Sequence, residues 1–199
     1  MIAVAIALGA YEAAGASGRV MRAADAMEHL RGVRFSLEAN VTATGSGAVG
    51  DVASRYRGTG ELVPPDRLRL VVTEPRPATL VIVGQRVLLD GEPASTTALR
   101  TLASPIAVLE QLREPGAATF GGLGFARGSL TARYRIDRGD RGVVEVELGL
   151  LDDLVRRQTF TVTEAAPPDG SGLQAVQTTY VVEYWEHGAA LEVREPERP

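Results

Sequence analysis

The chain has 199 residues, of which 45% are hydrophobic and 23% charged, a composition typical of a folded globular protein rather than a disordered one. Its net charge of −4 at pH 7 lacks the basic excess of nucleic-acid-binding proteins, so we expect no nucleic-acid partner. The sequence contains no cysteine, which excludes disulfides, thiolate zinc sites and a cysteine nucleophile.

Residues 1–17 have the pattern of an export signal, or of a disordered segment before the folded domain. The apolar run Ile2–Ala10 is followed by the small residues Ala13–Ser17, in the order of a signal's hydrophobic region and cleavage zone. The run is too short to span a bilayer, and the alternative is a buried first helix. Its end resembles a lipobox, but Tyr11 stands where the acylated cysteine would be. We therefore expect an extracytoplasmic bacterial protein, in the periplasm or cell envelope, without a lipid anchor.

One folded domain is expected over residues 18–196, because no linker or change of composition divides this stretch. It begins with a helix predicted from Gly18 to Arg31, in which apolar residues recur at helical spacing: Val20, Ala23, Ala24, Met27 and Leu30. Ser17 is expected to cap the start of this helix, and Gly32 is expected to end it in the left-handed conformation.

Strands with one dry and one wet face follow the helix. In the clearest case, Phe35 to Thr42, apolar and polar residues alternate, so successive side chains lie on opposite faces of a sheet. Turns rich in proline, glycine and aspartate separate the predicted strands of this half, which are Val33–Ala43, Ala53–Val63, Arg67–Thr73, Thr79–Val83 and Arg86–Leu89. Connections this short require neighbouring strands to run antiparallel.

A second helix is predicted between Ser95 and Arg113, with Ser104 as its cap and Pro105 at its first position. A glycine-rich stretch, Gly121–Gly124, leads back into strands, which are predicted at Ser129–Asp137, Gly142–Leu150, Leu154–Thr163, Gln174–Trp185 and Ala189–Arg194. The predicted order of elements is therefore helix, sheet, helix, sheet.

The residues that could carry catalysis, a cofactor or a metal each have a structural explanation. Gly45–Gly50 matches the letters of a dinucleotide fingerprint, but the strand predicted after it favours a hairpin loop. Asp152 and Asp153 lie between two alternating segments and are predicted to form a hairpin turn rather than a metal site. His29 and His187 are expected at the surface, and no serine lies in a nucleophile elbow. We therefore expect no enzymatic activity, no cofactor and no metal.

Three segments share the order of elements of a known bacterial family. A short helix runs directly into a long strand over Val20–Phe35, a strand, proline turn and strand follow over Arg57–Leu70, and a strand and turn end the domain over Tyr180–Val193. Together they resemble the LolA-like bacterial lipoproteins, especially the mycobacterial LppX and LprG type. The resemblance extends from about Arg19 to Pro196.

The resemblance implies a single-domain α+β fold, in which helices cover the concave apolar face of a strongly curved antiparallel half-barrel. It implies a non-enzymatic carrier with a cavity for a lipid or an acyl chain, and membrane surfaces or lipoprotein clients as further partners. We expect a monomer. The alternative is an envelope regulatory domain, similar to sigma-factor regulators, that binds a protein partner on the same scaffold. An esterase is the weakest alternative.

The dry face of the strand Arg67–Thr73 is expected to face the apolar side of the middle helix across an acyl chain. Burying each acyl methylene is worth about 0.8 kcal/mol, so such a face can hold a long chain without a polar motif. A core that the same side chains fill without a void is the alternative. Thr131 is expected on the wet face. The predicted lining consists of Phe35, Leu37, Leu62, Leu68, Leu70, Val72, Leu80, Ile82, Ile106, Leu109, Leu112, Tyr134, Phe160, Tyr180, Val182 and Tyr184.

Overall fold

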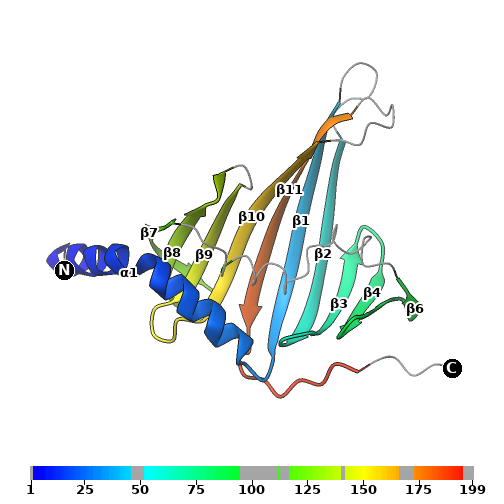
Figure 1. Ribbon diagram of the computed structural model, residues 1–199, viewed down its shortest axis with the longest axis horizontal. Coiled ribbons are helices and arrows are strands. Elements are labelled where there is room, and N and C mark those ends of the chain that lie inside the picture. Colours follow the sequence, from blue (N-terminus) through cyan, green and yellow to red (C-terminus); the bar gives the residue numbers. More distant parts are fainter. Residues whose placement is uncertain are drawn as a thin grey trace.

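One long helix and one antiparallel sheet of eleven strands make up the part of the chain that the structure describes (Figure 1). The structure is a computed structural model, and it describes residues 2–45, 52–94, 112, 117–139, 142–165 and 173–194. In chain order the elements are α1 (Ile2–Glu28), β1 (Val33–Gly45), β2 (Val52–Val63), β3 (Arg67–Glu74), β4 (Ala78–Val83), β5 (Arg86–Leu89), β6 (Glu92–Pro93), β7 (Ala117–Ala126), β8 (Ser129–Asp137), β9 (Val143–Gly149), β10 (Val155–Ala165) and β11 (Leu173–Trp185).

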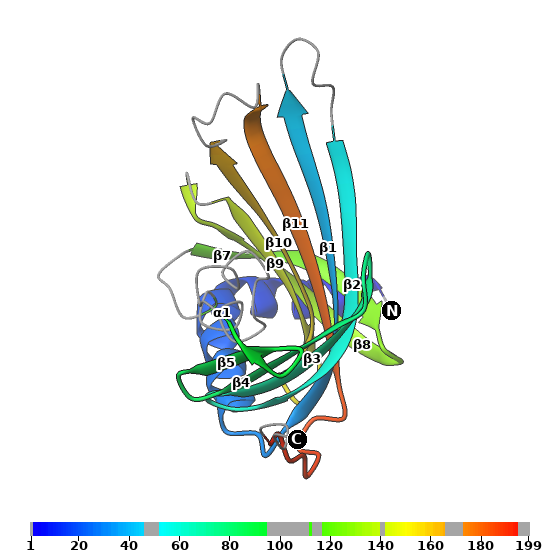
Figure 2. The ribbon, with the colours of Figure 1, turned by 90° about the vertical axis from the view of Figure 1, so that its right-hand side faces the viewer.

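The sheet is built from antiparallel neighbours in the order β6-β5-β4-β3-β2-β1-β11-β10-β9-β8-β7. Consecutive strands are neighbours throughout, except that β6 and β7 lie at opposite edges and β1 pairs with β11. In that pair Phe35 lies opposite Tyr184, and Leu37 lies opposite Val182. The sheet stays open and curves around α1 (Figure 2). This arrangement confirms the predicted single-domain α+β fold, an open and strongly curved antiparallel sheet with a helix on its concave side.

Each strand contributes one face to the core and the other to solvent. On β3, Leu68, Leu70 and Val72 are buried, and the residues that alternate with them are exposed. We call the apolar, concave side of the sheet the inner face and the polar side the outer face. The predicted strands from Val33 to Leu89 and from Ser129 to Trp185 are confirmed within a few residues at their ends.

Helix α1 is longer than the sequence predicts and differs at both ends. It begins at Ile2, so Ser17 is an interior residue rather than a cap, and its hydroxyl oxygen accepts a hydrogen bond from the backbone nitrogen of Ala118 at 3.1 Å. Gly32 does not adopt a left-handed conformation. It is needed for a close approach instead, because a Cβ atom there would lie 2.8 Å from the carbonyl oxygen of Ala189.

Two stretches of the sheet also differ from the prediction. The glycine-rich stretch at Gly121–Gly124 is part of edge strand β7, where Gly124 leaves room for its neighbours, since a Cβ there would lie 2.9 Å from Nε of Arg133. The predicted strand Ala189–Arg194 is wrong, because these residues form no ladder. Both edges of the preceding strand, β11, are already occupied by β1 and β10, so this segment has no adjacent edge to join. The predicted helix between Ser95 and Arg113 lies outside the described residues, apart from Leu112.

Two glycines on β2 leave room for large side chains of the neighbouring strands to pack directly against its backbone. A Cβ on Gly60 would lie 2.5 Å from the ring of Phe35 and would collide with the carbonyl oxygen of Arg69. A Cβ on Gly58 would lie 2.9 Å from the side chain of Leu70. The inner face at β1–β3 therefore depends on the absence of side chains at Gly58 and Gly60.

Candidate functional site

The inner face is a mainly apolar surface that crosses most of the sheet, with Gln158 as a buried polar residue within it. Because the strands are in register, inward side chains form rows across them. One row consists of Tyr134, Val146, Gln158, Val182, Leu37, Gly58, Val72 and Ala78, from β8 to β4. The next row contains Phe160 and Tyr180, whose rings stack with centroids 4.6 Å apart. The alternation in the sequence therefore becomes one apolar surface in the fold.

The structure places most of the predicted lining residues in one buried cluster on this face. Ile82 is partly buried against the cluster, and Ile106 and Leu109 lie outside the described residues. Their use as a ligand site stays a prediction. The members of the cluster are Phe35, Leu37, Leu62, Leu68, Leu70, Val72, Leu80, Leu112, Tyr134, Phe160, Tyr180, Val182 and Tyr184.

Tyr184 brings a polar group into this apolar surface. Its side chain is fully buried beside Phe35, and burial raises the pKa of its hydroxyl, so the hydroxyl stays protonated. Among the described residues, the hydroxyl has no hydrogen-bond partner. Leaving a buried hydroxyl unpaired costs about 1–3 kcal/mol. The sequence could not reveal this, because the alternation of β11 shows only that Tyr184 points inward.

Helix α1 covers one part of the inner face. Its residues Val20, Ala23 and Met27 are buried, and its main contacts are with β7, β8 and β10. We call β7–β11 the helix wing and β1–β6 the far wing. No described helix has comparable contacts with the far wing. Among the described residues, no helix is both long and apolar enough to cross a membrane.

A polar clamp fixes α1 to the helix wing. Arg19, which is nearly buried, donates hydrogen bonds to a carboxylate oxygen of Asp153 and, at 3.2 Å, to the carbonyl oxygen of Leu150. Asp153 adopts a left-handed backbone conformation with a φ of 55°, which aspartate tolerates better than most residues. The predicted hairpin turn at Asp152 and Asp153 is confirmed. The sequence did not reveal that this turn also binds the helix.

Exposed apolar residues lie at the end of the helix wing. Phe125 and Leu130 are paired across β7 and β8 and are 72% and 54% exposed. Leu130 alternates with Thr131, so it belongs to the same face as buried Ala132 and Tyr134. The apolar surface of the inner face therefore continues to the molecular surface at this hairpin.

The outer face carries many ion pairs between neighbouring strands. Glu38 accepts a hydrogen bond from Arg55 at 2.7 Å and another from Arg57 at 3.4 Å. The hydrogen bond from Arg55 is the main reason why the pKa of Glu38 lies below its usual value. Thr131, expected to be wet, is on the outer side but fully buried, because its hydroxyl donates a hydrogen bond to Glu147 beneath Gly124.

The two histidines differ in their surroundings. His29 is exposed, as predicted. His187 is half-buried, because the chain after β11 folds back onto β10 and places its ring between Arg156 and the carbonyl oxygen of Val155. Burial lowers the pKa of His187. In the part of the chain that the structure describes, no group of three or more metal-ligating side chains comes together.

Comparison with known proteins gives similarities in fold. No protein-family model matches the chain, and no curated protein matches it. LprF from Mycobacterium bovis is similar over 91% of this chain and 96% of its own, with 10% identity and a TM-score of 0.47. A structure of Pseudomonas aeruginosa MucA/MucB is similar over 89% of this chain and 58% of that chain, with 16% identity and a TM-score of 0.40.

A LolA superfamily protein from Nitrosomonas europaea is also similar, over 89% of this chain and 94% of its own, with 9% identity and a TM-score of 0.36. At such identities the similarity concerns the fold alone. The open, curved sheet with a helix inside its curve agrees with the arrangement that the resemblance in the sequence implies.

Proposed function

We propose that this protein is a non-enzymatic carrier that binds the acyl chain of a lipid or lipoprotein on its inner face, as a monomer outside the cytoplasm. The observation that carries the proposal is the mainly apolar inner face, which extends from the far wing to the exposed residues Phe125 and Leu130. Ligands are usually bound by concave, mainly apolar surfaces with few polar groups. The signal-like segment 1–17 supports the proposed location.

The far wing is the part of the inner face best suited to an acyl chain. The clamp between Arg19 and Asp153 fixes α1 over the helix wing, so a ligand there would have to displace packed helix side chains. In the far wing Leu70, Val72 and Leu80 are buried on the inner face, and no described helix has comparable contacts with these strands. Each acyl methylene buried against them contributes about 0.8 kcal/mol.

The hydroxyl of Tyr184 offers a ligand a hydrogen-bond donor within this apolar site. It lies beside Phe35, next to the far wing, and has no partner among the described residues. The carbonyl oxygen of an acyl ester accepts a hydrogen bond and carries no charge, so it suits a buried neutral donor. We therefore place the ester end of the acyl group near Tyr184 and its tail along the far wing.

Displacement of a fluorescent fatty-acyl probe from the folded full chain tests this proposal. Leu70→Arg places an unpaired charge on the inner face and should abolish saturable binding. Val71→Arg, one residue along on the outer face, is the matched control and should bind as the wild type does. Circular dichroism confirms that each variant is folded. Tyr184→Phe, which keeps the shape of the core, is the second variant and should bind esterified acyl chains several-fold more weakly.

Binding to a protein partner is the second candidate function. It is favoured by Phe125 and Leu130, since exposed apolar side chains on an edge hairpin can pack against a partner strand. If folded wild-type protein shows no saturable binding of any acyl lipid, the carrier function fails and the partner-binding function takes its place.

A further inference from the structure

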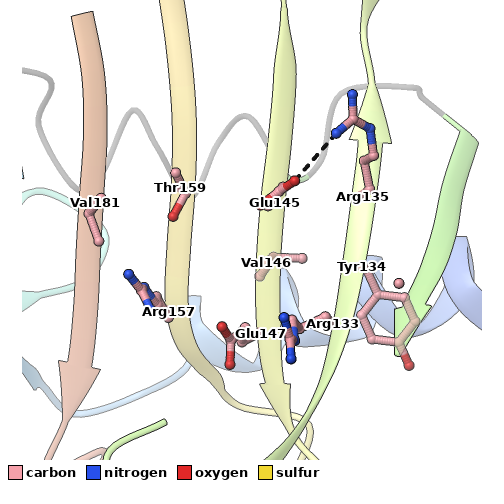
Figure 3. A pocket seen from close by; sticks show the side chains of 10 residues that line it. Arg133, Tyr134, Arg135, Glu145, Val146, Glu147, Arg157, Thr159 and Val181 are labelled. Carbon is pink, nitrogen blue, oxygen red and sulfur yellow. Dashed lines mark hydrogen bonds and ion pairs between the residues drawn. The ribbon is translucent and has the colours of Figure 1, made fainter. Parts of the chain in front are cut away.

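The outer face of the helix wing contains a polar hollow of about 430 Å³. Its walls come from β7 to β11, and the charged side chains that point into it are Arg133, Arg135, Glu145, Glu147 and Arg157 (Figure 3). This volume lies within the range of small-molecule sites. The hollow is separated from the proposed acyl site by the sheet itself, so the two sites are independent.

The hollow exists because the β7–β8 hairpin folds over the outer face. Arg127 in its turn lies 3.0 Å from Glu183 on β11, donates a hydrogen bond to Ser36 on β1 at 3.1 Å, and lies over the ring of Trp185. Strands β9 and β10 lie between β8 and β11 in the sheet. The hairpin can therefore reach β11 and β1 only by bending across the outer face, and the bend encloses the hollow.

Most charges in the hollow are already paired within the protein. Arg135 lies 3.4 Å from Glu145, and Arg133 donates a hydrogen bond to the carbonyl oxygen of Leu123 at 2.9 Å. Only one oxygen of Glu147, Oε2, accepts a hydrogen bond, which comes from Thr131 at 2.8 Å. The other oxygen accepts none among the described residues. Glu147 therefore keeps an unused acceptor in the hollow.

Arg157 supplies the complementary unused donor. It lies opposite Glu147 on the neighbouring strand, yet the two side chains form no ion pair within 4 Å, and Glu183 on its other side is bound by Arg127. Within the described part of the chain, Arg157 forms no hydrogen bond or ion pair, and its Nε is buried without a partner. Buried donors are almost always bonded, so an arginine held in this way is prepared for an acceptor from outside the protein.

We propose that this hollow binds a small zwitterionic group, with its phosphate or carboxylate on Arg157 and its ammonium on Glu147. The guanidinium of Arg157 can donate two parallel hydrogen bonds to such an anion, and Thr159, two residues further along β10, adds a hydroxyl. Glu145 and Glu147 repel polyanions, which excludes polyphosphates and nucleic acids. The headgroup of an aminophospholipid and a free small zwitterion share this chemistry.

Titration of the full chain with phosphoethanolamine, followed by the amide resonances of β8–β11, tests the proposal. We expect saturable shifts, at least tenfold weaker binding in Arg157→Gln, and at least tenfold weaker binding of inorganic phosphate and of ethanolamine to the wild type. The matched control is Arg69→Gln, which removes an exposed outer-face arginine that forms no ion pair with a described residue and should bind as the wild type does.

Vesicles distinguish the two sources of the zwitterion. Sedimentation with phosphatidylethanolamine vesicles that is lost in Arg157→Gln identifies a lipid headgroup, whereas binding of free phosphoethanolamine alone identifies a soluble ligand. Glu147→Gln, which keeps the shape of the side chain, should weaken phosphoethanolamine binding tenfold and leave phosphate binding unchanged. Equal binding of phosphate and phosphoethanolamine, an equal loss in Arg69→Gln, or no saturable shift with either source would overturn the proposal.

Discussion

The helix wing and the far wing have the same alternating sequence pattern but differ in what covers them. In the helix wing, α1 packs on the strands and the clamp between Arg19 and Asp153 ties it to the β9–β10 turn. In the far wing, Gly58 and Gly60 let Phe35 and Leu70 lie close to the backbone, so close packing comes from the sheet itself. An alternating strand pattern therefore fixes which side of a strand is dry, while contacts that are distant in sequence decide what packs against that side.

The largest effect is expected from filling the close contact in the far wing. Gly60→Val places side-chain atoms against Phe35 and against the carbonyl oxygen of Arg69, and should lower the free energy of unfolding by about 3 kcal/mol or more. Gly121→Ala on β7 is the control, because a Cβ there makes only ordinary contacts, the nearest at 3.6 Å. Urea unfolding measures both. Equal stability of Gly60→Val and the wild type would contradict the packing described for this wing.

Removing the clamp between Arg19 and Asp153 should lower the free energy of unfolding slightly less than Gly60→Val does. Arg19→Met leaves the carboxylate of Asp153 with only its longer ion pair to Arg22, at 3.9 Å, and should destabilise the protein by about 2–3 kcal/mol. Asp153→Asn, which tolerates the same backbone conformation, completes a double-mutant cycle. A coupling energy near zero would mean that the clamp does not hold α1. Hydrogen exchange should also rise in α1 and in β7 before it rises in β3.

Removing one atom, the hydroxyl oxygen of Tyr184, tests the buried contact between the two wings. Tyr184→Phe removes a buried hydroxyl that has no described partner, so the ligand-free protein should be unchanged or more stable by about 1 kcal/mol. Thermal unfolding of delipidated protein measures this. A clear loss of stability would show that the hydroxyl is bonded within the protein rather than kept for a ligand.

The smallest effect is expected for the pH dependence of stability, which His187 near the end of the helix wing should influence. Its pKa in the folded protein lies below the usual 6.5, because of burial first and of Arg156 as well. The unfolded chain therefore binds the proton more readily, so the stability is fully present above pH 6.5 and falls as the pH drops from 6.5 towards the lower folded-state pKa. His187→Asn should remove this part of the pH dependence in urea unfolding between pH 7 and pH 5. An unchanged slope in that variant would assign the effect to other groups.

The inward residues of the candidate site could be predicted because alternation is a local property. Leu68, Leu70 and Val72 were assigned to the dry face from spacing alone, and they are buried in the structure. The partners of polar residues could not be predicted in this way. Arg19 and Asp153 are 134 positions apart, and no local pattern relates two such residues. The same holds for Arg127, which meets Glu183 only because a hairpin folds across the sheet.

By itself, the sequence determined where most of the strands lie, where most of them turn, and which side of those strands is dry, because backbone geometry puts successive side chains of a strand on opposite faces. It also determined that no thiol chemistry operates here. Only the tertiary structure decided that β7 is a strand, that Gly32 serves a close contact, that Ala189–Arg194 remains outside the sheet, and that Arg157 lies in a hollow without a partner among the described residues. Those outcomes depend on which strand edges are occupied and on which distant side chains come into contact. Both are decided by tertiary packing and not by the local sequence.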